Sequence, residues 1–302
     1  MIHWRISNDS TSVICSLTCQ TINDRTMPTS LKATAVQMAS GPNVNANLFE
    51  IERIVAAAVD EGSNLIVLPE NFAFMGQTCR DMLAIQEKAG EGPLQTFLSD
   101  LARKHGIWLV GGTIPLSTAD ESKVRAACLV YSDSGELSGR YDKLHLFDVQ
   151  LPDIEEQYKE SSVIEPGNTP LVVETPFGNI GVAVCYDLRF PELFRSMLSA
   201  KPDLFAIPSA FTAATGKAHW EPLVRARAIE NLCYVIAAAQ GGYHVSGRET
   251  HGHSMIVDPW GTVLSQVPRG TGFVTSKLDI ELLHTTRRNF PSLDHRRLMC
   301  EL

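Results

Sequence analysis

The hydrophobic pattern alternates between short apolar runs and helical stripes. Residues 32–39 read as a strand, and residues 43–60 carry apolar side chains at helical spacing. Residues 65–68 are wholly apolar and end at Pro69, as expected for a strand buried on both faces. This succession of strand and helix predicts an α/β protein.

The same pattern continues to the end of the chain. A helix is predicted from Pro93 to its stop at Gly106, and residues 126–131 and 136–141 read as a hairpin closed by a short glycine-containing turn. A hairpin among strand and helix units predicts a mixed sheet. Further strands are predicted at residues 107–110, 171–174, 179–184, 204–207, 234–239, 254–257, 262–265 and 271–277, and further helices at residues 191–198 and 217–232.

The organisation of these elements predicts one domain. No linker or repeat divides residues 31–302, and the strands outnumber what one helix-covered parallel sheet needs, so we expect a four-layer α-β-β-α sandwich of two mixed sheets with helices outside. Residues 143–170 are irregular and rich in Pro, Asp and Glu, which favours a functional opening. Residues 1–30 are interpreted as a flexible leader.

Composition excludes several classes of partner. Apolar residues make up 44% of the chain, charged residues make up 20% and the net charge is -8, without the basic stripe that binds nucleic acid. No apolar stretch approaches the roughly 18 residues of a membrane span, and no signal peptide is evident. Seven cysteines without paired spacing favour reduced thiols, so we expect a cytoplasmic protein without membrane partners.

Cys185 is the first candidate for chemistry. It follows the apolar residues 180–184 and precedes a helix opened by Pro191, which places it at a strand-to-helix turn. Such a turn aims backbone N–H groups and a helix dipole at the thiol, which favours the thiolate and can hold an oxyanion. The alternative is a buried cysteine that acts as a small hydrophobic side chain.

A thiol nucleophile needs a base, and the histidines offer no clear one. His251 and His253 could form a metal pair, but alternate residues are expected to straddle a strand, and a papain-like Cys–His enzyme has no better support. A buried Glu can take the thiol proton instead, and a fixed Lys can stabilise an oxyanion. Glu70 and Lys143 fit these roles unless they are ordinary surface charges.

Three segments carry a family resemblance. LIVLPENF (residues 65–72), GRYDKLHLFDV (139–149) and VAVCYDLRFPEL (182–193) resemble, in this order, the catalytic segments of the nitrilase superfamily of carbon-nitrogen hydrolases. The resemblance extends over about residues 32–279. It implies that Glu70 is the base, Lys143 the stabiliser of the intermediate and Cys185 the nucleophile. It also implies a second glutamate, for which Glu160 is the best match and for which Glu155 and Glu156 compete.

The residues after the nucleophile indicate amides as substrates. True nitrilases usually carry Trp-Glu there, whereas this chain has Tyr186-Asp187. The branch that this chain most resembles contains deaminated-glutathione amidase and the nitrilase-like half fused to fragile-histidine-triad proteins; ω-amidases form the nearest sister group. The segments that carry this likeness are CYDLRFPEL (185–193), PSAFTAATGKAHWEPLVRARAIEN (208–231), YVIAAAQGG (234–242) and HGHSMIVDPWG (251–261).

The resemblance implies a cysteine-dependent amidase without metal or organic cofactor. A small carboxylate-bearing amide, deaminated glutathione first, would be cleaved to an acid plus ammonia through a thioester, with the Tyr186 backbone N–H assisting Lys143. Arg189 is a candidate clamp for the substrate carboxylate unless it forms a structural ion pair. The resemblance adds Phe211 and Thr215 to the pocket and implies a homodimer or a higher homo-oligomer.

Two kinds of rival remain open at this point. Within enzymes, an ω-amidase acting on 2-oxoglutaramate or an N-carbamoyl amide hydrolase would use the same three residues. In a different class, the chain would be a non-catalytic binding scaffold that retains the fold alone.

Overall fold

Strand β1 (Leu31–Met38) lies at the centre of the protein because three strands pair with it. β2 (Leu65–Val67) and β12 (Tyr234–Tyr243) run parallel to it, and β16 (Gly272–Leu278) runs antiparallel. The computed structural model describes residues 31–150 and 157–298. The predicted leader, residues 1–30, lies outside the described residues.

The strands around β1 form one mixed sheet. Fourteen strands are joined by hydrogen bonds, with the main order β4-β5-β3-β2-β1-β12-β11-β10-β9, while β7 and β8 pair separately. The remaining strands, in chain order, are β3 (Trp108–Val110), β4 (Ile114–Ser117), β5 (Val124–Tyr131), β6 (Leu137–Asp142), β7 (Asp148–Gln150), β8 (Gln157–Lys159), β9 (Leu171–Thr175), β10 (Gly178–Val182), β11 (Leu204–Ser209), β13 (Glu249–His251), β14 (Met255–Val257) and β15 (Val263–Gln266).

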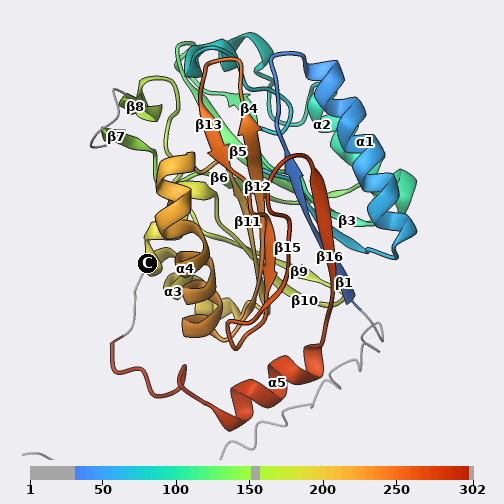
Figure 1. The fold of residues 1–302 in the computed structure, drawn as a ribbon, viewed down its shortest axis with the longest axis vertical. Helices are drawn as coiled ribbons and strands as arrows, with labels where there is room; N and C mark the ends of the chain where they lie inside the picture. The colour runs from blue at the N-terminus through green and yellow to red at the C-terminus, as the bar shows by residue number, and fades with distance from the viewer. Residues whose placement is uncertain (1–30, 151–156, 299–302) are drawn as a thin grey trace, which may run out of the picture.

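Helices cover the strands from both sides. Figure 1 shows α1 and α2 on one side of the strands and α3 and α4 on the other, with α5 at the end of the chain's last strand. The α-helices are α1 (Val44–Asp60), α2 (Pro93–His105), α3 (Pro191–Ser196), α4 (Ala213–Asn231) and α5 (Ile280–Asn289). Short 3-10 helices are η1 (Cys79–Ile85), η2 (Glu160–Ser162), η3 (Cys185–Arg189) and η4 (Met197–Ala200).

Alternation along β1 separates two hydrophobic cores. Ala33 and Ala35 belong to the larger core, which extends to β10, β11 and α4, whereas Val36 and Met38 belong to the core beneath α1 and α2. Successive strand residues point to opposite faces, so one strand contributes to both cores. The near-continuous burial of β1, β2 and β3 follows from this two-sided packing.

The predicted α/β class with a mixed sheet is confirmed. Because hydrogen bonds link fourteen strands into one sheet, the arrangement of two separate sheets in four layers stays a prediction. β4, β7, β8, β13 and α5 were not predicted, and α4 begins at Ala213 rather than at residue 217. Gly216 and Pro222 inside α4 weaken its helical pattern, and the short α5 buries only Leu283.

No helix in the described ranges combines the length and the apolar character required to cross a membrane.

A side chain at Gly112 should collide with the loop that carries Glu70 and destabilise the protein. Its φ is +59°, and a Cβ atom there would lie 2.2 Å from the Pro69 carbonyl oxygen. Gly112→Ala is therefore expected to lower the free energy of unfolding by about 1–3 kcal/mol, because it combines overpacking with backbone strain. Denaturant unfolding measures the loss. Gly41→Ala is the control: nothing lies within 4 Å of its Cβ position, and a comparable loss there would contradict the steric explanation.

Candidate active site

The parallel strands bring the predicted catalytic side chains to one edge of the sheet. Glu70 follows β2, Cys185 follows β10 and Ala210 follows β11, and these strands all belong to the parallel part of the sheet. Their carboxyl ends therefore meet at the same edge, where α/β sheets bind ligands. Lys143 reaches this edge from the end of β6, the second strand of the predicted hairpin.

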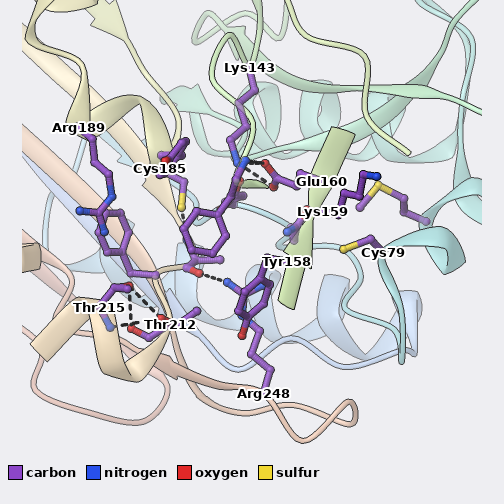
Figure 2. Close-up of a pocket in the computed structure, with 17 residues that line it drawn as sticks. Cys79, Lys143, Tyr158, Lys159, Glu160, Cys185, Arg189, Thr212, Thr215 and Arg248 are labelled. Carbon is purple, nitrogen blue, oxygen red and sulfur yellow. Dashed lines mark hydrogen bonds and ion pairs between the residues drawn. The ribbon is translucent and has the colours of Figure 1, made fainter. Parts of the chain in front are cut away.

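A cavity opens at this edge, and we call it the inner cavity. All eight side chains predicted for the site line it (Figure 2). They are Glu70, Lys143, Glu160, Cys185, Tyr186, Arg189, Phe211 and Thr215. Nine further residues complete the lining: Asn71, Cys79, Met82, Phe147, Tyr158, Lys159, Ala210, Thr212 and Arg248.

Lys143 is buried between two carboxylates. Its Nζ donates to Glu70 Oε1 at 2.8 Å and to the two carboxylate oxygens of Glu160 at 2.8 and 2.9 Å. Only 1% of its side chain is exposed, so these ion pairs are shielded from water. Burial acts to lower the pKa of Lys143, but Glu160 and Glu70 outweigh it and hold the pKa well above its ordinary value. The ammonium group therefore stays charged.

Glu160 is held by the irregular segment as well as by Lys143. Its Oε2 accepts a hydrogen bond from the Phe147 backbone N–H at 2.7 Å, and its own residue opens η2 directly after β8. The Glu160 carboxylate thus accepts hydrogen bonds from the Lys143 ammonium group and from the Phe147 backbone, which fix it in the cavity wall. The competing candidates Glu155 and Glu156 lie outside the described residues.

Cys185 has an unusual backbone conformation at the strand-to-helix turn. Its φ is +50°, in the left-handed region that side chains other than glycine seldom adopt. The side chain projects into the inner cavity, and Sγ accepts from the Ala210 N–H at 3.4 Å. Such strain at a reactive side chain is typical of functional turns.

The protonation of this thiol differs from the sequence-based expectation. Burial raises the pKa of Cys185 well above its ordinary value, and Glu70 adds to the rise, while Lys143 and the Ala210 N–H oppose it. The expectation of a thiolate favoured by the turn was wrong because it omitted desolvation and the two carboxylates. A neutral thiol of this kind requires a neighbouring base before it can act as a nucleophile.

Asp187 anchors the nucleophile turn to the segment around Lys143. The carboxylate is fully buried and accepts from the Val184 N–H at 2.8 Å, the Tyr141 hydroxyl at 2.6 Å and the His145 N–H at 3.0 Å. The His145 ring nitrogen Nδ1 lies 2.7 Å from the same carboxylate. Tyr141 and His145 flank Lys143 in the chain, so one carboxylate fixes both sides of the site.

Arg189 lies on aromatic faces rather than against a carboxylate. Its guanidinium carbon is 5.8 Å from the Tyr186 ring centre and 5.3 Å from that of Phe211. Nη1 lies 3.2 Å from His219 Nδ1. Within residues 31–150 and 157–298, no carboxylate forms an ion pair with Arg189. The alternative of a structural ion pair therefore finds no support there.

The amino end of α4 positions the other two predicted pocket residues. Phe211 packs on the buried Trp220 with ring centres 5.1 Å apart. The Thr212 hydroxyl caps α4 by accepting from the Thr215 N–H, and the two hydroxyl groups lie 2.8 Å apart. The cap fixes Thr215 at the cavity wall.

Sequence reasoning missed Cys79, Lys159 and Arg248. Arg248 comes from the loop between β12 and β13, and its Nη2 donates to the Ala210 carbonyl. Cys79 opens η1, and this residue is exposed to solvent. Arg248 lies in a loop, Cys79 in a short 3-10 helix and Lys159 in a three-residue strand, so no periodic pattern marks them and only their charge or thiol chemistry could have drawn attention to them.

His251 and His253 do not straddle a strand, contrary to the expectation. Their rings stack with centres 4.3 Å apart, because β13 ends at His251 and Gly252 turns the chain with a φ of +72°. Burial lowers the pKa of His251 to about 4, with His253 contributing to the effect. Neither ring lines the inner cavity.

The fold and site define a carbon-nitrogen hydrolase. The family model described as "Carbon-nitrogen hydrolase" matches residues 32–288, so the chain belongs to this family, whose members act on carbon-nitrogen bonds other than peptide bonds. A Yersinia enterocolitica protein named deaminated glutathione amidase is 39% identical over 268 residues, which are 88% of this chain and 93% of that protein. The predicted family and enzyme class are confirmed.

Solved structures show the same architecture. The C. elegans NitFhit protein matches with a TM-score of 0.80 and 35% identity; the match covers 89% of this chain but only 65% of that longer chain. Nit3 of Saccharomyces cerevisiae, described as a member of branch 10 of the nitrilase superfamily, matches with a TM-score of 0.80 and 30% identity over 89% of this chain and 97% of its own.

The anchoring role of Asp187 can be tested by its amide analogue. Asp187→Asn replaces an oxygen acceptor by an NH₂ donor facing other donors, and should lower the free energy of unfolding by about 1–3 kcal/mol. Tyr141→Phe removes one of the hydrogen bonds and should cost about 1 kcal/mol. Urea unfolding measures both. If Asp187→Asn were as stable as the unchanged protein, the buried carboxylate would not hold the turn.

Proposed function

We propose that the protein is a cysteine-dependent amidase that hydrolyses a small carboxylate-bearing amide, with deaminated glutathione as the preferred substrate. The observation that carries this proposal is the buried Glu70–Lys143–Glu160 ion-pair network in the same cavity as Cys185. Two carboxylates and one ammonium group beside a thiol supply a base, a charge stabiliser and a nucleophile. The pKa values of Lys143 and Cys185 both lie well above their ordinary values, and groups with shifted pKa values gather at functional sites.

The first half of the proposed reaction forms a thioester. Glu70 takes the Cys185 proton, and Sγ forms a bond to the amide carbon, whose oxygen becomes negatively charged. Lys143 and the Tyr186 backbone N–H stabilise this oxyanion. The carbon-nitrogen bond then breaks, and the leaving nitrogen takes the proton from Glu70.

The second half releases the acid. Water gives a proton to Glu70 as its oxygen attacks the thioester carbon, and the carbon-sulfur bond breaks. The sulfur recovers its proton and the free carboxylic acid leaves. Glu160 orients Lys143 throughout, which is supported by its two contacts to Nζ.

The raised pKa of Cys185 supports a base-dependent mechanism. A thiol whose pKa lies well above its ordinary value supplies little thiolate at neutral pH, so proton removal must accompany the attack. Glu70 contacts Lys143 and interacts electrostatically with Cys185, which suits a group that accepts this proton and returns it.

The substrate proposal rests on the relatives and on Arg189. The relatives named deaminated glutathione amidase are 36–41% identical to this chain. Arg189 would bind the carboxylate of the 2-oxo acid half, for which a planar guanidinium without an anionic partner is suited. Phe211 and Thr215 would enclose the rest of that half.

The nature of the leaving group depends on the substrate. Deaminated glutathione has no primary amide, so its hydrolysis releases an amine rather than the ammonia expected from the sequence. Ammonia is released only from a primary amide such as 2-oxoglutaramate, the substrate of the alternative ω-amidase, or from the carbamoyl group of an N-carbamoyl amide.

We further propose the predicted four-layer packing of a single domain that begins at residue 31. The larger core between β1–β3 and β10–β12 supports this, since the continuous sheet would then fold over on itself.

A homodimer is also proposed, supported by the exposed rings of Trp260 and Phe290, whose centres lie 5.7 Å apart. The unpaired Cys79, Cys128, Cys185 and Cys233 fit the proposed cytoplasmic location.

Removing the nucleophile should abolish turnover without unfolding the protein. Cys185→Ala is expected to fold normally and to hydrolyse amides at a negligible rate, whereas Lys143→Ala should lose roughly 100-fold or more in kcat, or about 3 kcal/mol. Amide hydrolysis is followed by product analysis, with circular dichroism as the control for folding. An active Cys185→Ala protein would refute the assignment.

A substrate panel separates the proposed activity from its rivals. Deaminated glutathione, 2-oxoglutaramate and an N-carbamoyl amino acid are compared by kcat/KM, and the first should be preferred. Preference for either of the others would favour the corresponding rival, and binding without turnover of all three would favour a scaffold.

Arg189 should discriminate between anionic and neutral acyl groups. Arg189→Ala is expected to raise KM by about 10-fold or more for an amide with a 2-oxo acid carboxylate, because a charge-assisted contact is lost. The matching neutral amide should change much less. Equal changes in KM for the two amides would remove Arg189 from the proposed carboxylate site.

A further inference from the structure

A second cavity adjoins the inner cavity, and we call it the outer cavity. The two share six lining residues: Asn71, Cys79, Met82, Tyr158, Lys159 and Arg248. Its other walls come from residues 74–80, 162–163 and 246–247. A molecule in the inner cavity can therefore extend into the outer one without leaving the site.

The outer cavity is cationic, although the chain as a whole has a net charge of -8. Arg80, Lys159 and Arg248 line it, and no Asp or Glu is among its described lining residues. In the part of the chain that the structure describes, none of these three forms an ion pair with a carboxylate. Their charges are therefore available to an anionic ligand, as in other clefts lined by one sign of charge.

Arg248 stands at the junction of the two cavities. Its Nη2 donates to the Ala210 carbonyl, and its guanidinium carbon lies 5.2 Å from the Tyr158 ring centre. Nε is buried and has no hydrogen-bond partner among the described residues. The N–H of the same residue, Ala210, donates to Cys185 Sγ. Ala210 therefore contacts both the Arg248 guanidinium and the proposed nucleophile.

The cations flank the nucleophile on both sides. In Figure 2, Arg189 lies on one side of Cys185, and Lys159 and Arg248 lie on the other. An amide whose acyl carboxylate binds Arg189 and whose carbonyl carbon meets Sγ must direct its nitrogen substituent away from Arg189. The outer cavity is the space that receives this amine half.

We propose that the outer cavity is a binding site for a carboxylate on the leaving amine. Deaminated glutathione, the substrate proposed above, is a secondary amide with an anion at each end, and the outer cavity assigns its amine-side carboxylate to Arg80 and Lys159. This inference rests on the proposed amidase function and deepens it. A primary amide leaves the outer cavity unused, and apolar residues such as Phe74 and Met75 suit the stem of a longer amine.

The test uses two amides that differ by one charge. 2-Oxoglutarate is joined through its C5 carboxyl group to glycine in one and to glycinamide in the other. The unchanged protein should show a kcat/KM about 10-fold higher for the glycine amide, the size of a typical charge-assisted contact. The ratio compares substrates within one enzyme, so effects on the shared chemical steps cancel.

The double variant Arg80→Met/Lys159→Met should reduce this ratio to about 2-fold or less. Arg248 is left in place because it holds Ala210 beside the nucleophile. The control variant Arg53→Met/Lys277→Met removes the same charges from residues outside both cavities and should keep the 10-fold ratio. Equal kcat/KM for the two amides in the unchanged protein, or an unaltered ratio in the double variant, would overturn the proposal.

Calorimetric binding separates this proposal from the amidase function itself. Both amides are titrated into Cys185→Ala protein, with and without the Arg80→Met/Lys159→Met pair. Tighter binding of the glycine amide that the pair abolishes supports the outer carboxylate site even if neither amide is hydrolysed, in which case the amidase proposal fails alone. Equal affinities for the two amides overturn the outer site, whatever the turnover.

Discussion

The hydrogen bonds to the buried Asp187 carboxylate are the constraint on which the site depends. They join the Val184–Cys185 turn at the end of one parallel strand to Tyr141 and His145 on the segment that carries Lys143. A single acidic side chain therefore fixes the relative positions of a thiol and an ammonium group that lie far apart in the sequence.

The charges within this frame explain the protonation of the site. Two carboxylates surround one buried ammonium group, and this acidic environment, together with burial, keeps the neighbouring thiol protonated. The sulfur therefore stays in its unreactive, protonated form until Glu70 removes the proton as a substrate carbonyl is attacked. Arg189, resting on aromatic faces instead of on an anion, leaves a positive charge free at the far wall.

The sequence predicted the strands and helices with strong periodicity and the three segments that carry Glu70, Lys143 and Cys185, and the structure brings the candidate Glu160 to Lys143. It predicted these because apolar periods and compact motifs are local properties of the chain. The protonation of Cys185 could not be predicted, since desolvation depends on atoms from distant segments. Arg248 was missed for a related reason: its loop has no period, and its value comes from the Ala210 carbonyl that it meets in space. The connection of all main strands through β1 likewise depends on long-range pairing.

The left-handed backbone at Cys185 sets folding and chemistry against each other at one position. A residue with a Cβ atom is held there at a conformational cost of about 1–2 kcal/mol, which glycine would avoid. Without selection for turnover, replacement of Cys185 by glycine would relieve this cost. Persistence of cysteine at this position in descendants of the gene is consequently a record of continued selection for turnover.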